Sequence, residues 1–403
     1  MKIGFAGNTN NYPFLLAENL KDDFEILFIV DSHPLDKLGR PEYYHGSLVS
    51  YPYPSNFIEK TKLQQKKNRY FPYLFSRDVI KLLNTCDVVI TNEAGHYLVP
   101  FLKKKTLTLS LFSGADLDVN CSWLAKNRII RSKKNLLKKI ITFFAFYYGQ
   151  IILEKSIRRS KLISYFPEGL HPIGDDIIRK CKKGISYTRF EHMHLPLNGL
   201  EYTPPPENKL VRIFNTARFN WQKPFLPGMV EADNKKNDIL IRGIARFIHA
   251  SHIPLDIHFI EKGRDVEPTK LLLKELEIEQ YVTWHRSLPH LEFIKMLKAC
   301  DIVTEHMNEH VIGGGAFGMA LGRPMISNAA TKIINRVTGV ETEICHAETE
   351  EDVQQWLEKL VPDKEFRIRK GIASREYIEK YFDLKIETDF FKRFIQKEFQ
   401  LDT

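Results

Sequence analysis

Cysteine is scarce in this sequence, and the few cysteines show neither the spacing of a metal site nor that of a disulfide framework. The 403 residues include five, far apart along the chain: Cys86, Cys121, Cys181, Cys300 and Cys345. Zinc sites and redox pairs place two cysteines a few residues apart, so both classes of site are disfavoured. We therefore expect free thiols, buried in the core of a protein from a reducing compartment.

The sequence also lacks an apolar run as long as a membrane span. The longest run, 140–153, is interrupted three times by polar residues or glycine and falls short of the ~20 residues that cross a bilayer. Residues 1–7 carry one basic residue and a short apolar stretch, without the longer apolar region and cleavage site of a signal peptide. We therefore expect a cytoplasmic globular protein.

Acidic residues are outnumbered, and one stretch almost lacks them. Lysine and arginine total 59 against 50 aspartates and glutamates, which gives a net charge of +9. Eleven of the basic residues lie between Lys126 and Lys161, where Glu154 is the single acid and aromatic and aliphatic residues are interleaved. A basic amphipathic segment of this kind is typical of helices that lie on an anionic membrane surface.

An ordinary helical hairpin with a solvated charged face is the alternative interpretation of this basic stretch. Nucleic acid would be a third anionic partner, but the sequence has no zinc finger, homeodomain or aromatic RNA-binding motif. We therefore predict contact with an anionic membrane through residues 126–161 and no nucleic-acid partner.

The length and the order of apolar segments predict two α/β domains. A chain of 403 residues exceeds the ~250–300 residues at which one hydrophobic core stops growing. Nearly continuous apolar strands alternate with helical segments, which is the pattern of parallel sheets covered on both faces. We predict an N-terminal domain over 1–195, a linker over 196–209, a C-terminal domain over 210–372, and a C-terminal helix over 373–403 that packs back toward the N-terminal domain.

The predicted elements are short and regularly spaced. In the first half we expect strands at 2–6, 24–30, 88–91, 107–111 and 162–166 and a helix over 14–20. In the second half we expect strands at 210–215, 255–260, 281–284, 301–305 and 324–327 and helices over 238–251, 269–276, 291–299 and 313–321. Ligands of open α/β sheets bind at the carboxyl ends of the strands, so functional residues are expected in the loops there.

Three glycines follow one of the strands expected in the second half. Gly313, Gly314 and Gly315 stand where a strand-end loop should lead into a helix, so backbone N–H groups and the helix N-terminus could hold a diphosphate. Close packing of a tight turn is the alternative interpretation. The run also contains Gly-x-Gly-x-x-Gly, a weak match to dinucleotide-binding proteins, so an NAD-dependent dehydrogenase is the alternative from another class.

The surroundings of the glycines resemble the donor site of the retaining glycosyltransferases of family 4, which have the GT-B fold. The family pattern is a glutamate, seven residues, a second glutamate and a small-residue helix that ends in Gly-x-Pro. Glu309 stands at the first glutamate, and Gly322-Arg323-Pro324 stands at the ending without a gap. Pro196-Leu197-Asn198-Gly199 is similar to the family's interdomain Pro-Asn-Gly. The resemblance implies an α/β protein of two Rossmann-like domains whose parallel sheets face a central cleft.

The resemblance also implies which residues hold the donor. Thr216-Ala217-Arg218 is similar to the family's Gly-Arg, and residues 235–241 are similar to its Lys-Gly-x-Asp-x-Leu-Ile. The family's arginine and lysine clamp the donor diphosphate, which implies Arg218 and Lys235 here. Lys223, five residues after Arg218, competes for the place of the lysine. The predicted diphosphate site is completed by the backbone of Val311, Ile312, Gly313, Gly314 and Gly315.

One position departs from the family pattern. The second glutamate, which holds the ribose hydroxyls of the nucleotide, is Phe317 here, and a phenyl ring cannot accept those hydrogen bonds. Either another residue holds the nucleoside, or the donor has none, as in phosphoribosyl diphosphate. A phosphoribosyltransferase of the same fold is therefore the second interpretation.

Residues of both domains are predicted to complete the site. Glu309 would face the donor sugar as a catalytic residue, and Asp116 would contact the acceptor or act as its base. A helix N-cap is the alternative role of Asp116. Gly7 and Asn8, at the end of the first strand, and His310, beside Glu309, would line the cleft; an ordinary turn is the alternative for the first two.

The sequence thus predicts a glycosyltransferase, a hexosyl- or pentosyltransferase, with a sugar-diphosphate donor and a glycan or lipid-linked acceptor. Asp116-Leu117-Asp118 also matches a metal motif of another glycosyltransferase fold, but the resemblance implies a metal-independent enzyme without a cofactor. The resemblance and the basic stretch together imply a role in surface polysaccharide or lipopolysaccharide assembly at the inner face of the cytoplasmic membrane.

Overall fold

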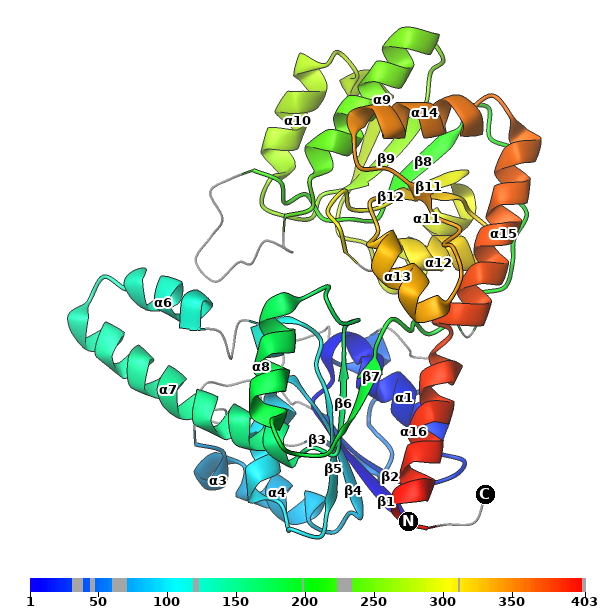
Figure 1. The fold of residues 1–403 in the computed structure, drawn as a ribbon. Helices are drawn as coiled ribbons and strands as arrows, with labels where there is room; N and C mark the ends of the chain where they lie inside the picture. Colours follow the sequence, from blue (N-terminus) through cyan, green and yellow to red (C-terminus); the bar gives the residue numbers. More distant parts are fainter. Residues whose placement is uncertain are drawn as a thin grey trace. The chain divides into compact units, whose positions relative to one another are not determined.

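In the computed structural model the chain folds into two compact units. The structure describes residues 1–30, 39–43, 48–59, 71–118, 123–197, 199–222, 234–310 and 312–400. Of the described residues, unit 1 contains those in 1–192 and 384–400, and unit 2 contains those in 193–222 and 234–383. The C-terminal segment therefore belongs to the same unit as the N-terminus (Figure 1).

Unit 1 is built on a seven-stranded sheet in which every neighbouring pair is parallel. The order is β3-β2-β1-β4-β5-β6-β7, so the chain moves outward from β1 in one direction and then in the other. The strands are β1 (Lys2–Ala6), β2 (Glu25–Val30), β3 (Phe57–Glu59), β4 (Val88–Asn92), β5 (Leu107–Leu111), β6 (Leu162–Tyr165) and β7 (Thr188–Glu191).

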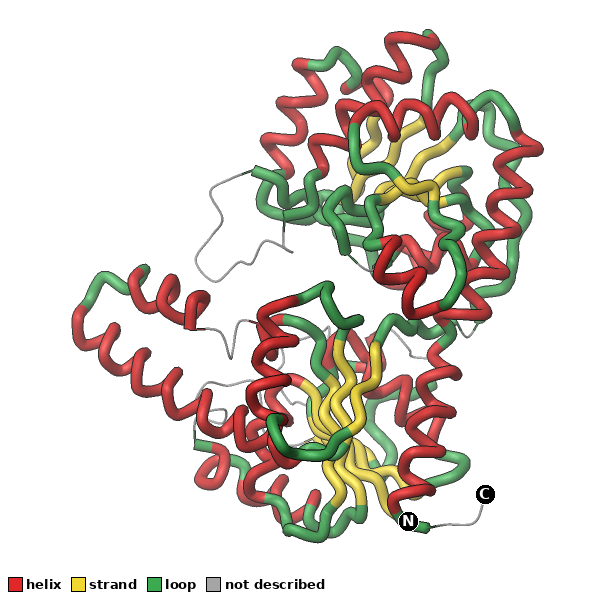
Figure 2. The backbone as a smooth tube through the Cα atoms, in the orientation of Figure 1, coloured by secondary structure: helices red, strands yellow, loops and turns green. Residues whose placement is uncertain are grey.

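Helices cover this sheet on both faces, as Figure 2 shows. They are η1 (Thr9–Asn11), α1 (Tyr12–Leu20), η2 (Pro41–Tyr43), α3 (Pro72–Phe75), α4 (Arg77–Leu83), η3 (Glu93–Phe101), α5 (Ala115–Asp118), α6 (Trp123–Arg131), α7 (Leu136–Arg159), α8 (Pro172–Lys182) and α16 (Leu384–Glu398). Helix α16 buries Leu384, Phe391 and Ile395 in one hydrophobic cluster with α1 and the strands. The last helix of the chain is therefore part of the core of unit 1.

Unit 2 repeats the plan with a six-stranded parallel sheet of order β10-β9-β8-β11-β12-β13. Its strands are β8 (Arg212–Asn215), β9 (Asp256–Ile260), β10 (Val282–His285), β11 (Ile302–Thr304), β12 (Met325–Ser327) and β13 (Cys345–His346). Its helices are α9 (Asn237–Ser251), α10 (Val266–Glu275), η5 (Glu279–Tyr281), α11 (His290–Ala299), α12 (Gly315–Ala320), α13 (Thr331–Thr338), α14 (Glu350–Leu360) and α15 (Lys364–Phe382).

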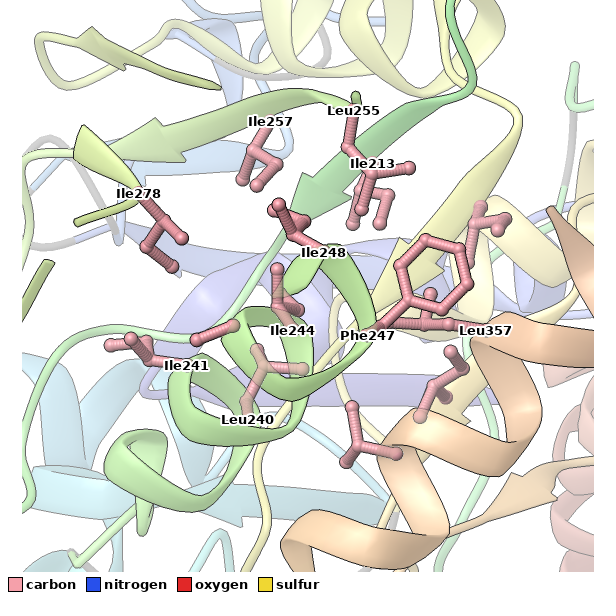
Figure 3. Close-up of a cluster of buried hydrophobic side chains, with 14 of the residues drawn as sticks. Ile213, Leu240, Ile241, Ile244, Phe247, Ile248, Leu255, Ile257, Ile278 and Leu357 are labelled. Carbon is pink, nitrogen blue, oxygen red and sulfur yellow. The ribbon is translucent and has the colours of Figure 1, made fainter. Parts of the chain in front are cut away.

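The core of unit 2 follows from the apolar periodicity of α9. Its buried residues recur at helical spacing, with Ile244 and Ile248 directed toward the sheet around Ile257, and Phe247 toward Leu357 of α14 (Figure 3). Helix α14 begins with a capping box in which the side chains of its N-cap Thr349 and of Asp352 each accept a backbone N–H. Helix α9 is thus packed between the sheet and α14.

The predicted fold class, α/β with two parallel sheets, is confirmed. Each predicted strand lies within two residues of an observed one, and β1 and β5 have the predicted bounds. Three strands were not predicted, namely β3, β7 and β13, and all three lie at sheet edges. An edge strand of two to four residues needs no continuous apolar run, so its sequence gives little signal.

The first segment of unit 1 ends at His192, and the N-terminal domain predicted from the sequence ends at residue 195. The helix predicted over 373–403 is two helices, because the chain is extended at Asp383, and only α16 belongs to unit 1. Amphipathic patterning predicted helix on both sides of this break but not the break itself.

Helix α7 is longer than the apolar run from which we expected no membrane span. With 24 residues and a mean hydropathy of 1.4 in its most apolar window, it is long and apolar enough to cross a membrane by length and composition. Only 17% of that window is buried in the structure. The longest apolar run of the sequence is thus part of a longer, largely exposed helix.

The cysteines of the described residues are free thiols, as predicted. Cys86, Cys181, Cys300 and Cys345 are buried and unpaired with one another. Burial raises the pKa of Cys181 to about 11 and the pKa values of Cys300 and Cys345 to about 12. These side chains are therefore protonated at neutral pH and unsuited to nucleophilic catalysis. Cys121 lies outside the described residues.

Candidate functional site

The sheet of unit 2 has a point at which the strand order reverses, and the loops there are the candidate site. Strand β8 is flanked by β9 on one side and by β11 on the other, although β11 comes much later in the chain (Figure 1). Loops at such a switch point diverge and leave room for a ligand at the carboxyl ends of the strands. The loop after β8 contains Arg218, and the loop after β11 contains Glu309, Gly313 and Gly314 and leads into α12 at Gly315.

Backbone hydrogen bonds join the loops after β8 and β9 into one support. The N–H of Phe219 donates to the carbonyl of Lys262 at 2.7 Å, and the N–H of Asp265 donates to the carbonyl of Phe219 at 3.0 Å. Gly263, between them, has φ +119°, and a Cβ there would lie 2.2 Å from the carbonyl oxygen of Phe219. Only glycine allows this approach, which places Arg218 and Lys262 on neighbouring loops.

The segment before α9 connects this support to the loop after β11. The N–H of Lys235 donates to the carbonyl of Asn220 at 2.6 Å, and the carbonyl of Lys235 accepts from the N–H of Met307 at 2.9 Å. The side chain of Asn220 also accepts from the N–H of Arg264 at 3.0 Å. The predicted Arg218, Lys235 and Glu309 therefore come from three loops that hydrogen bonds hold together.

Two cations of this support are exposed and have no acidic partner in the described part of the chain. Arg218 and Lys262 make no ion pair among the residues that the structure describes, and both are exposed. Desolvation lowers the pKa of Lys262, and the positive charge of Arg218 lowers it further. Two like charges that repel each other at a strand-end switch point favour an anion as the ligand.

Lys262 was not predicted as a site residue. It follows β9, and the signal that could have found it is a basic, glycine-containing loop, Glu261-Lys262-Gly263-Arg264, after a strand that neighbours β8. Two predicted residues, Lys223 and Val311, lie outside the described residues. Among Arg218, Lys235 and Lys262, the first and the last are exposed and Lys235 is half-buried.

Glu309 and His310 lie at the end of the loop after β11. Glu309 is exposed, and His310 is anchored by its backbone, whose carbonyl accepts from the N–H of Ala330 at 2.8 Å. The ring of His310 lies 5.6 Å from that of His306, measured between centroids. His306 is buried and donates through Nδ1 to the carbonyl of Asn308 at 2.9 Å. These contacts of His306 and His310 hold the loop in place, and the Glu309 carboxylate is left exposed to solvent.

The glycine run is packed more closely than a ligand-binding role requires. The buried Glu305 accepts the N–H of Gly313 at 3.0 Å, so this amide is already engaged by a carboxylate. A Cβ on Gly315 would lie 2.2 Å from Sδ of Met325, whereas a Cβ on Gly314 would meet nothing within 3.4 Å. Helix α12 begins at Gly315, two residues later than predicted. Close packing therefore explains Gly313 and Gly315, and the side chain of the predicted Ile312 is buried.

Phe317, the position that departs from the family pattern, belongs to a group of rings. It is half-buried, with ring centroids 5.9 Å from His290 and 6.5 Å from Phe293, both in edge-to-face arrangements. Burial lowers the pKa of His290, so this ring favours its neutral form. Aromatic rings of this kind offer a stacking surface rather than hydrogen-bond acceptors.

The predicted Gly7 and Asn8 lie at the switch point of unit 1, between β1 and β4. Gly7 has φ +92°, and a Cβ there would lie 1.9 Å from the carbonyl oxygen of Asn92. The side chain of Asn8 is buried; it donates to Asn11 and to the carbonyl of Gly39, both at 2.8 Å, and accepts from the N–H of Phe14. These contacts fit the structural alternative, a tight turn that leads into α1.

Asp116 is also buried and engaged. Its carboxylate accepts the N–H of Ser113 at 2.9 Å and lies 3.3 Å from Nε2 of His96, which is itself fully buried. The other nitrogen of His96 lies 3.0 Å from the hydroxyl of Thr91. An Asp–His pair without solvent contact orients α5 and η3, so the geometry fits the helix-capping alternative better than a base, and a role toward the acceptor stays a prediction.

A second polar cluster at the strand ends of unit 1 was not predicted. Glu387 of α16 is fully buried and accepts hydrogen bonds from the hydroxyls of Tyr12 and Ser164, the latter at 3.2 Å. Its other oxygen lies 3.0 Å from Nδ1 of His192, which follows β7. Burial, and then the charge of Glu387, raise the pKa of Tyr12. Residues 375 positions apart form this cluster, so no local pattern could have found it.

Comparisons with known proteins bear on the fold. The sequence matches no family model and no curated protein. Among solved structures, it is similar over all of both chains to the sucrose-phosphate synthase of Thermosynechococcus elongatus, with a TM-score of 0.61 and 11% identity. It is also similar to Anabaena HepE in complex with UDP-glucose, with a TM-score of 0.63, 11% identity, and coverage of 98% of this chain and 100% of the other.

A third similar structure is an alpha-glucosyltransferase in complex with UDP-glucose and DNA that contains an abasic site. Its TM-score is 0.60 at 12% identity, and the match covers 96% of this chain and 98% of the other. The matches span both units, and the two parallel sheets have the strand reversals of Rossmann-like domains. The chain therefore has the GT-B glycosyltransferase fold.

Proposed function

We propose that this protein is a glycosyltransferase that uses a nucleotide-sugar donor and holds its diphosphate on the strand-end loops of unit 2. The observation that carries the proposal is a pair of exposed cations, Arg218 and Lys262, which make no ion pair with any described residue and lie at the switch point of a GT-B sheet. The fold adds support, because two of the similar structures contain UDP-glucose. The resemblance to family 4 agrees in assigning Arg218 to the diphosphate.

The chemistry of transfer suits these residues. Bond cleavage at the anomeric carbon passes through an oxocarbenium-like state while negative charge grows on the departing diphosphate. Arg218 can bind phosphate oxygens in a bidentate manner, and Lys262 and Lys235 add point charges from the adjoining loops. Because hydrogen bonds fix these loops to one another, the backbone that carries the charged side chains is positioned before the donor arrives. The exposed Glu309 is the residue proposed to face the donor sugar.

The ring group around Phe317 supports a nucleotide as part of the donor. A base or ribose can pack on Phe317, Phe293 and His290, so a nucleoside could be held without the family's second glutamate. The missing glutamate equally favours the second candidate, a phosphoribosyltransferase whose donor has no nucleoside. The two candidates share the diphosphate site and differ in whether the ring group contributes to binding.

We propose a glycan or lipid-linked acceptor and a place in surface polysaccharide assembly on the cytoplasmic side of the membrane. The free thiols of the four described cysteines support a reducing compartment. The carboxylates of Asp116 and Glu387 are buried and engaged by neighbouring side chains, so they suit a neutral acceptor such as a sugar more than a charged one.

The first experiment is a binding screen by thermal shift and titration calorimetry. The ligands are UDP, UDP-glucose and other nucleotide sugars, phosphoribosyl diphosphate, pyrophosphate, NAD and NADP. Binding of a nucleoside diphosphate to the parent protein, reduced at least ~10-fold by Phe317→Ala and at least ~10-fold by Arg218→Ala, is the expected result. A control variant, Lys274→Ala, removes an exposed cation on α10 and should bind like the parent protein.

The other outcomes separate the alternatives. Binding of phosphoribosyl diphosphate without any nucleotide would favour the phosphoribosyltransferase. Binding of NAD or NADP alone would favour the dehydrogenase. A protein that binds nucleotide sugars equally well with and without Arg218 would contradict the proposed diphosphate site.

A further inference from the structure

Helices α6 and α7 of unit 1 form a hairpin whose outer part carries an exposed apolar stripe. Figure 1 shows the hairpin extending away from the sheet of its own unit. On α7, Leu137, Ile141 and Phe144 are 63%, 59% and 63% exposed, and their spacing of four and three residues places them on one face. Leu136 and Ile140 are exposed beside them. A soluble helix would bury such a stripe or replace it with polar residues.

Helix α6 does not cover this stripe, because it packs on a different side of α7. Trp123 of α6 contacts Phe143 and Tyr147, with ring centroids 5.6 and 6.4 Å apart. Lys126 donates to Oε1 of Gln150 at 2.8 Å from the same side. The apolar surface instead continues onto the chain before α3, where Phe71 stacks on Tyr148 at 5.8 Å.

The charged residues of the hairpin segment that carries the stripe are all positive. Residues 123–153 contain seven lysines and arginines and no aspartate or glutamate. Lys134 and Lys138 are exposed at the tip of the hairpin, next to the stripe, and Arg131 is exposed at the end of α6. Apolar area bordered by cations complements an anionic lipid surface, where acyl chains lie beneath negative headgroups.

The length of the exposed part decides how α7 could meet a bilayer. From Gly149 onward, Ile152, Leu153 and Ile157 are buried in a core cluster of unit 1, so this half cannot leave the protein. The exposed half, 136–148, has 13 residues and a length of about 20 Å, against about 30 Å for the hydrocarbon core. Crossing would also carry the basic tip through the bilayer.

We propose that the α6–α7 hairpin docks this protein on an anionic bilayer, with the exposed half of α7 lying in the plane of the headgroups rather than spanning. Leu137, Ile141 and Phe144 enter the acyl boundary, and Lys133, Lys134 and Lys138 contact the headgroups. The proposal goes beyond the transfer reaction and also narrows it: it favours an acceptor that is itself held in the membrane by a lipid.

The test is co-sedimentation of the full chain with vesicles of phosphatidylcholine alone or with ~30% phosphatidylglycerol. We expect binding to the anionic vesicles that falls as salt rises, because the Debye length shortens from about 10 to 3 Å between 0.1 and 1 M. Leu137→Ser/Ile141→Ser/Phe144→Ser should reduce the bound fraction at least ~10-fold. Lys133→Glu/Lys134→Glu should abolish the preference for anionic lipid.

Matched control variants separate docking through the hairpin from nonspecific adsorption to the vesicles. Leu271→Ser/Leu291→Ser removes two comparably exposed leucines of unit 2, and Lys104→Glu/Lys105→Glu reverses two adjacent exposed lysines of unit 1. Both should bind like the parent protein. Equal loss in the controls, or no binding to anionic vesicles at low salt, would overturn the proposal. If the parent protein is a dimer that does not bind vesicles, and the triple variant is a monomer, the stripe is instead the interface with a second copy of this chain.

The orientation of the hairpin in the bilayer is measured separately. A dithionite-sensitive dye on Ser132→Cys, at the exposed tip of the hairpin, should be fully quenched by reagent added outside the vesicles. Protection of the dye would mean that the tip crosses the bilayer and that α7 spans. Neither assay needs a donor sugar, so failure of the membrane proposal and failure of the proposed transferase activity are distinguishable.

Discussion

The two units use one sheet plan but treat the carboxyl ends of their strands in opposite ways. In unit 1 two groups of ionisable side chains near the strand ends are buried and engaged with one another: Asp116 with His96, and Glu387 with Tyr12 and His192. In unit 2 the corresponding loops present Arg218 and Lys262 to solvent without a partner among the described residues.

This difference has a physical consequence. A buried cluster whose hydrogen bonds are satisfied stabilises the fold and offers little charge to a ligand. Two unpaired cations instead repel each other and raise the energy of the empty site, and a bound anion removes this repulsion. The strand-end loops of unit 2 therefore offer unpaired charge to a ligand, and the two buried clusters of unit 1 do not. Substitutions should accordingly affect mainly stability in unit 1 and mainly affinity in unit 2.

The largest effect is expected from Glu387→Ala in unit 1. The substitution leaves the buried hydroxyls of Tyr12 and Ser164 without their acceptor and should lower the free energy of unfolding by about 3 kcal/mol. Denaturant unfolding measures this change. Glu398→Ala, at an exposed position of the same helix, should change stability by less than ~0.5 kcal/mol. Equal effects of the two variants would show that the cluster does not stabilise unit 1.

The next effect concerns affinity in unit 2. Arg218→Ala/Lys262→Ala removes both exposed cations and should weaken binding of UDP about 100-fold, since each charge-assisted bond contributes ~1.5 kcal/mol or more. Stability should change little because neither side chain is packed. Lys209→Ala/Lys274→Ala removes two exposed lysines elsewhere in the unit as a charge-matched control. A double variant that loses stability but keeps its affinity would reverse the proposed contrast between the units.

A smaller effect tests whether unit 2 is rigid beneath its charged surface. Gly315→Ala places a Cβ 2.2 Å from Sδ of the buried Met325 and should destabilise the protein by ~1–3 kcal/mol. Gly314→Ala meets no atom closer than 3.4 Å and should cost less than ~1 kcal/mol. Thermal unfolding compares the two. If Gly314→Ala instead abolishes UDP binding without loss of stability, the glycine run has a ligand role beyond packing.

The sequence predicted the elements well because parallel strands buried on both faces have a strong apolar signal. It also predicted Arg218, Lys235 and Glu309, which the structure places on loops joined by hydrogen bonds. It predicted Asp116 and Asn8 with two alternatives each, and burial of both side chains favours the structural ones.

What the sequence did not predict depends on contacts between distant segments. Lys262 becomes a candidate only because β9 neighbours β8, and Glu387 only because α16 returns to unit 1. The packing role of Gly315 likewise requires the position of Met325 on the adjacent strand β12. Local patterns carry strand and helix signals, whereas the partner of a charge is set by topology.

The smallest effect expected is a pH dependence of donor binding that comes from Lys262. Its pKa lies below the ordinary value of ~10.4, chiefly through desolvation and further through Arg218, so its charge is lost as pH rises through this lowered pKa. Affinity for UDP should therefore decline on the alkaline side, and Lys262→Arg, which stays charged, should show a flatter profile. Stability moves in the opposite sense. Because the unfolded chain still binds this proton above the lowered pKa, stability rises slightly with pH up to ~10.4.

Titration calorimetry with UDP at pH 7.5 to 10 measures the affinity of the parent protein and of Lys262→Arg. The difference between the two affinities isolates the titration of the lysine from that of the uracil ring. Identical profiles would mean that Lys262 does not contact the anion, and the candidate site would then rest on Arg218 and Lys235.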